Sequence, residues 1–134
     1  MNDDPHSTPH ATAQVTEVLR EEHEAITLLI DEIDRTDTPE QKQYLMDEIE
    51  RRFTSHSEFE DQLLSATLAV ADSPAIVELA ETALAADREA CNALREIASM
   101  FPWARGYDRE VERIIEKLRS HFAFEEEDVF PVIR

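Results

Sequence analysis

The sequence predicts an all-α protein, an up-down-up-down four-helix bundle, and two observations support this. The chain of 134 residues contains a single glycine, which leaves few turn-forming residues. Four stretches place apolar residues at alternating three- and four-residue steps, the spacing of one face of an α-helix. The length fits one domain, expected over residues 13–134, preceded by a flexible leader over residues 1–12.

The first helix is expected from about Ala13 to Asp34. His23 takes the one step of its apolar stripe that lacks an apolar residue, between Leu19 and Ile26. The other apolar residues of this stripe are Val15, Ile30 and Ile33. Two further histidines, His6 and His10, lie in the polar leader and are excluded from any site, because chain ends are usually poorly ordered.

The second helix is predicted to begin at Pro39. The segment from Thr38 to Gln41 combines an N-cap threonine, a first-turn proline and a capping-box glutamine. The helix should end near Val70, before a new stop and cap in residues 72–74. Its stripe consists of Leu45, Ile49, Phe53, His56, Glu60, Leu63 and Thr67.

The third helix is expected to start at Pro74 and to carry Asp87 on two overlapping apolar rows. Residues 101–107 contain a proline and the lone glycine, and so predict the longest loop between helices. Trp103 and Tyr107 are expected to fold over one end of the bundle.

The fourth helix is expected to be capped by Asp108 and ended by Pro131. Its stripe consists of Val111, Ile114, Leu118, His121, Glu125 and Val129. Four amphipathic helices joined by short loops bury their stripes against one another in a bundle.

Charge and composition exclude several classes of function. The chain has 31 acidic and 13 basic residues, a net charge of −18, which repels nucleic acid and anionic membrane surfaces. There is no apolar run of about 18 residues and no signal-peptide pattern, so a cytoplasmic protein is expected. Cys91 is the only cysteine, which excludes an internal disulfide and a cysteine-based zinc cluster.

Histidine and glutamate recur on the predicted inner faces. His56 and Glu60 are four residues apart, as are His121 and Glu125, so each pair projects from one helix face. Imidazole and carboxylate together suit iron, with manganese or zinc as alternatives, in a site without thiolate. A single histidine would more often be a hydrogen-bonded core residue, but three such positions with two matched glutamates indicate a metal site.

Three further acidic residues are candidates near this site. Asp87 has small neighbours on its stripe, Ala83 and Ala90, that leave room for an ion, although a solvent-facing or arginine-paired Asp87 is an equal alternative. Glu126 is a second choice to Glu125 as a ligand. Glu22 is a candidate for orienting a neighbouring imidazole.

Three segments resemble the hemerythrin-like (HHE) cation-binding domains. They are residues 19–26 (LREEHEAI), residues 56–60 (HSEFE) and residues 121–131 (HFAFEEEDVFP), and the resemblance extends over nearly the whole chain after the leader. It implies a four-helix bundle around a non-haem di-iron centre.

The resemblance also implies roles for five residues. His23 and His56 would serve one iron and His121 the other, and Glu60 and Glu125 would bridge the two irons.

The third helix departs from the pattern of the oxygen-carrying members of this family. Those members have one or two histidines there, whereas residues 74–100 contain none and Asp87 takes the corresponding position, with Cys91 four residues later. Replacing imidazole by carboxylate favours an oxidised metal and disfavours reversible oxygen carriage.

The leading hypothesis is therefore a metal protein that senses or reduces a small ligand: dioxygen, peroxide or nitric oxide. The alternatives are an iron-storage or iron-buffering protein and a metal-free helical interaction module.

Overall fold

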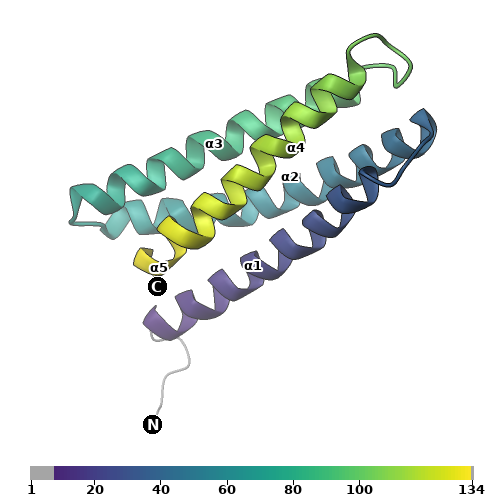
Figure 1. Cartoon of the computed structure of the whole chain (residues 1–134). Helices are drawn as coiled ribbons and strands as arrows, with labels where there is room; N and C mark the ends of the chain where they lie inside the picture. Colours follow the sequence, from purple (N-terminus) through teal and green to yellow (C-terminus); the bar gives the residue numbers. More distant parts are fainter. Residues whose placement is uncertain (1–7, 134) are drawn as a thin grey trace.

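The computed structural model describes residues 8–133, with side chains from residue 14 onward, and is built of helices. Figure 1 shows the four long helices side by side, with consecutive helices running in opposite directions. The helices are α1 (Thr8–Ile33), α2 (Pro39–Val70), α3 (Pro74–Ala98), α4 (Tyr107–Phe124), the π-helical turn η1 (Glu125–Val129) and α5 (Phe130–Ile133). No strand occurs within the described residues. The predicted all-α bundle is confirmed.

The bounds of α2 and the start of α3 agree with the sequence prediction. Thr38 is the N-cap of α2, and its hydroxyl accepts a hydrogen bond from the Gln41 backbone N–H at 3.2 Å. Pro39 and Pro74 each open a helix, where a missing N–H removes no helical hydrogen bond. Local sequence signals therefore fix these two helix starts.

Helix α1 begins at Thr8, earlier than the predicted start at residue 13. Residues 8–12 of the predicted leader are thus part of the helix. Pro9 is tolerated there because it lies in the first turn, and alanines 11 and 13 favour a helix. His6 lies outside the described residues.

Two predicted boundaries at the ends of α4 are wrong. Gly106 is the N-cap, with a positive φ of 91° that glycine adopts without strain, so Asp108 lies inside the first turn. There its carboxylate faces the positive end of the helix and accepts from Lys42 Nζ at 2.9 Å. Pro131 does not end the helix, because it is the second residue of α5 and falls in that segment's first turn.

The predicted packing of the α3–α4 loop is half right. Tyr107 is 1% exposed and belongs to the apolar core, whereas Trp103 is 64% exposed and lies outside the core. The first residue of α4 thus enters the core, while the larger aromatic ring of the preceding loop is mostly exposed.

The core consists of two apolar clusters with a polar layer between them. One cluster includes Ile26, Phe53, Ala90 and Leu118, and the other includes Leu19, Leu64, Leu84 and Val129. Helices α1, α2 and α3 each contribute to both clusters, as does the continuous helical run of α4, η1 and α5, and the residues between the two contributions include buried histidine or carboxylate side chains. Burying each large apolar side chain contributes about 1.5–3 kcal/mol, and this apolar packing holds the polar layer in place.

No helix within residues 8–133 combines the length and the apolar character needed to cross a membrane.

Candidate metal centre

All six predicted ligand residues lie in the polar layer, contributed by α1, α2, α3, α4 and the start of η1. Each is 5% exposed or less. The six residues are His23, His56, Glu60, Asp87, His121 and Glu125. Ionisable side chains are rarely buried together without a common partner, so their convergence is the main feature of this core.

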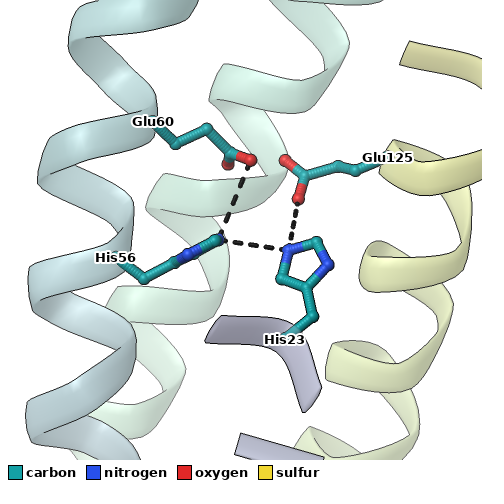
Figure 2. Close-up of side chains that lie close together, drawn as sticks. All are labelled: His23, His56, Glu60 and Glu125. Atoms are coloured by element: carbon teal, nitrogen blue, oxygen red, sulfur yellow. Dashed lines mark hydrogen bonds and ion pairs between the residues drawn. The ribbon is translucent and has the colours of Figure 1, made fainter. Parts of the chain in front are cut away.

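Four of these side chains form one group, which Figure 2 shows as sticks. His23 Nε2 lies 3.2 Å from His56 Nε2 and 3.1 Å from Glu125 Oε1. His56 Nε2 lies 3.8 Å from Glu60 Oε2 on the next turn of α2. One ligand atom from each of the four lies within 4.8 Å of the others, close enough to bind one cation.

A second group forms around His121 and includes Asp87. His121 Nε2 donates to Asp87 Oδ1 at 2.6 Å and lies 3.1 Å from Glu125 Oε2. Glu60 completes this group, again with ligand atoms within 4.8 Å of one another. Glu60 and Glu125 therefore belong to both groups.

Asp87 is not the solvent-facing or arginine-paired residue of the alternative interpretation. Its side chain is 3% exposed and contacts His121, while the neighbouring Arg88 pairs with Asp61 at 4.0 Å. Cys91, one turn further along α3, is half-buried and belongs to neither group.

Most of the buried oxygen atoms here lack hydrogen bonds. Both carboxylate oxygens of Glu60 and of Glu125, together with Asp87 Oδ2, have no hydrogen-bond partner. The Glu125 oxygens lie 3.1 Å from the imidazole nitrogens of His23 and His121, but not in hydrogen-bond geometry. Leaving such groups unsatisfied costs about 1–3 kcal/mol each, and more when they are charged. A bound cation would satisfy them together.

Two outer carboxylates orient the imidazoles of His23 and His56. His56 Nδ1 donates to Glu22 Oε1 at 2.7 Å, and His23 Nδ1 donates to Glu126 Oε2 at 2.8 Å. In each ring the Nε2 lone pair is then directed at the centre of the group. The sequence predicted that Glu22 orients a neighbouring imidazole, and the imidazole that it contacts is that of His56 on α2. Glu126 contacts the far side of His23 and belongs to neither ligand group.

The π-helical turn brings Glu125 and Glu126 to different sides of the same histidine. The Phe130 backbone N–H donates to the Glu125 carbonyl, five residues back, which widens the turn. Glu125 then reaches His23 Nε2, and Glu126 reaches His23 Nδ1. Such widened turns frequently occur at functional sites, and no sequence pattern predicted this one.

Phenylalanine rings surround the imidazoles. The Phe122 ring stacks on His23 with centroids 4.1 Å apart, and Phe130 lies on the same imidazole at 5.8 Å. Phe53 lies 5.8 Å from His56. These rings exclude water and lower the local dielectric, which strengthens the attraction between the carboxylates and any cation.

The charges of the group shift several pKa values. Burial and the neighbouring carboxylates Glu125 and Asp87 raise the pKa of Glu60 well above its usual value. Burial opposes the charged form of His121, but the contacts with Asp87 and Glu125 outweigh it and raise its pKa to about 9. Burial and the nearby His23 lower the pKa of His56, which favours the neutral imidazole that binds metals.

The pKa of Glu125 is depressed. Burial would raise it, but contacts with Glu60, His121 and His23 together outweigh burial, so this carboxylate stays ionised. The pKa values of Glu60 and Glu125 are thus shifted in opposite directions although the two carboxylates lie side by side in both groups.

Comparison with known protein families identifies the family of this chain. The family model described as the hemerythrin HHE cation-binding domain matches residues 14–133. The chain belongs to this family. Comparisons with curated proteins and with solved structures gave no significant match. The HHE domain covers all six candidate ligands, both outer carboxylates and the phenylalanine rings around the site. The resemblance seen in the sequence is therefore confirmed.

Proposed function

We propose that this HHE domain holds a dinuclear metal centre, with iron as the metal that best matches its donors. The observation that carries the proposal is the sharing of Glu60 and Glu125 by two ligand groups. A carboxylate has two oxygens and can bridge two cations, so shared carboxylates are expected when two ions lie side by side. His23 and His56 would complete one position, and Asp87 and His121 the other.

The donor set fits iron on chemical grounds. It contains imidazole nitrogen and carboxylate oxygen but no thiolate, a combination that also admits manganese or zinc. The unpartnered oxygens of Glu60, Asp87 and Glu125 are the atoms that such ions would satisfy.

We further propose that the centre binds or reduces a small ligand such as dioxygen, peroxide or nitric oxide. When bound, the metal pair would supply electrons and Lewis acidity to that ligand. An open groove of about 520 Å³ between α1 and α4 supports this role, since His23 and Glu126 line its inner side. Thr27, Phe122 and Ala123 also line this groove, and a small molecule that entered it would approach His23.

The third-helix carboxylate favours sensing or reduction over reversible oxygen carriage. Asp87 adds negative charge where the oxygen-carrying members have imidazole, and negative charge stabilises an oxidised metal. Glu22 and Glu126 act in the same direction, because a carboxylate on the outer nitrogen makes an imidazole a stronger base.

Turnover measured against metal content tests this function. Protein samples loaded with increasing iron should consume peroxide or oxygen in proportion to their iron content. Iron binding without any consumption would instead indicate storage or buffering. Protein that contains no metal and loses nothing on chelation would be a helical interaction module.

A further inference from the structure

The two ligand groups offer different donors. The imidazole-rich position (His23, His56, Glu60, Glu125) has two nitrogens, whereas the carboxylate-rich position (Glu60, Asp87, His121, Glu125) has one. Imidazole suits iron and zinc, and carboxylate suits manganese and other oxygen-preferring cations. The two positions therefore differ in the metals that they favour.

The hydrogen bonds at the outer nitrogen, Nδ1, of the imidazoles also differ between the two positions. Both imidazoles of the imidazole-rich position are held at Nδ1 by a carboxylate, at 2.7 Å for His56 and 2.8 Å for His23. The Nδ1 atom of His121 is buried and has no hydrogen-bond partner. An outer carboxylate fixes the ring and increases its basicity, so only one position is fully pre-organised for metals that prefer nitrogen.

Asp87 gives the carboxylate-rich position its distinct character. Oδ1 contacts His121, and Oδ2 is buried without a hydrogen-bond partner. Small side chains that are themselves fully buried, Ala83 and Ala90, lie one turn away on either side along α3. A third carboxylate beside Glu60 and Glu125 concentrates negative charge that only a hard cation would neutralise well.

We infer that the two positions select different metals, so that this chain can assemble a mixed-metal centre. The imidazole-rich position takes zinc or ferrous iron first, and the carboxylate-rich position takes manganese(II) or ferric iron. This inference rests on the proposed dinuclear centre and adds to it the metal preference of each position.

Competitive loading of the metal-free wild-type chain tests the inference. The protein receives equal amounts of zinc(II) and manganese(II), one of each per chain, and unbound metal is removed by gel filtration. Metal analysis should find zinc and manganese in equal amounts, and electron paramagnetic resonance should show isolated manganese(II) ions.

Two other results would overturn the inference. Exchange-coupled manganese pairs beside zinc pairs would show a dinuclear centre whose positions do not select between the two metals. Retention of zinc alone would show that the carboxylate-rich position does not take manganese. A chain that binds neither metal would overturn the dinuclear centre itself, and with it this inference.

Substitutions then locate each metal. Asp87→His gives the carboxylate-rich position a second imidazole, so the variant should lose manganese and take up a second zinc when zinc is supplied in excess. Asp87→His protein that still retains one manganese beside one zinc would refute the assignment. If this variant fails to fold, as judged by circular dichroism, Asp87→Asn should retain zinc and lose manganese.

The matched control acts on the other position. Glu126→Ala removes the acceptor of His23 Nδ1 and should weaken zinc binding by about 10- to 100-fold while manganese binding persists. Glu126→Gln keeps an acceptor oxygen and should restore much of the zinc affinity. Equal loss of zinc and manganese in Glu126→Ala would contradict the assignment of His23 to the imidazole-rich position.

Discussion

Metal affinity should rise with pH up to about 9, because His121 holds a proton below its pKa of about 9 in the metal-free protein and the pKa of Glu60 is also raised. The pKa of His121 is about 9, and the pKa of Glu60 is raised well above its usual value. A metal binds only the deprotonated forms and must displace these protons. His56, with its lowered pKa, is neutral at pH 7 and adds no proton.

The magnitude follows from the His121 pKa. At pH 7 the solution is two pH units below the His121 pKa of about 9. Each pH unit below the pKa lowers the apparent metal affinity tenfold, because the imidazole must lose one proton before it binds. Binding at the carboxylate-rich position should thus be about 100-fold weaker at pH 7 than above pH 9, and the protonated fraction of Glu60 steepens the dependence further.

Calorimetry measures this effect directly. Manganese(II), the metal assigned to the carboxylate-rich position, is titrated into metal-free protein at the same pH in two buffers of different ionisation enthalpy, and the difference in heat gives the protons released. We expect net proton release at pH 7 and a smaller release in Glu60→Gln, which lacks one titrating carboxyl group. Affinity independent of pH, with no proton release, would refute the proposal that His121 and Glu60 give up protons to bind metal.

Three further predictions concern the same centre. Chelation should lower the melting temperature. Removing an ion present at about 100 times its dissociation constant lowers the free energy of unfolding by about 2.7 kcal/mol, which corresponds to roughly 10 °C for a domain of this size. Identical melting temperatures with and without metal would contradict this prediction. His56→Ala and Glu60→Ala should each strongly reduce the metal content, whereas His6→Ala and His10→Ala should not, and metal loss in the latter pair would place the site elsewhere. Ala123→Phe should narrow the α1–α4 groove and slow azide binding to iron-loaded protein at unchanged iron content, and an unchanged rate would exclude this groove as the route.

The stability of the metal-free protein should change with pH in the opposite direction to metal affinity. His121 has a folded-state pKa above its ordinary 6.5, so its contribution is complete below pH 6.5 and is lost as pH rises through about 9. Glu60 has a raised pKa and likewise favours the fold in its protonated form, so its contribution decreases above its ordinary 4.5. The difference in melting temperature between loaded and stripped protein should therefore grow as pH rises from about 6.5 to about 9.

Helical periodicity was sufficient to predict the polar layer. His23, His56, Asp87 and His121 each fall on an apolar stripe, and a residue on the stripe of an amphipathic helix must face the core whatever its chemistry. Because the four helices are long and their loops are short, stripe residues at the same level along the bundle axis lie close to one another. Stripe position alone therefore predicted that these residues and the two glutamates, Glu60 and Glu125, are buried.

Contacts that depend on helix rotation and on backbone irregularity could not be predicted in this way. Glu22 contacts His56 across the bundle, and spacing within α1 does not determine which imidazole it meets. The π-helical turn leaves no trace in the acidic run after residue 124, because each residue there has similar polarity. The exposure of Trp103 depends on how the α3–α4 loop turns at Gly106, which periodicity does not describe.

The most direct test of the dinuclear centre is metal analysis of the purified protein together with its ultraviolet-visible spectrum. Two ligand groups that share Glu60 and Glu125 predict two metal ions per chain. If both are iron, the oxidised protein should show the near-ultraviolet charge-transfer absorption of a coupled ferric pair. A chain that binds one ion or none after loading with excess iron, manganese or zinc would contradict the proposed centre.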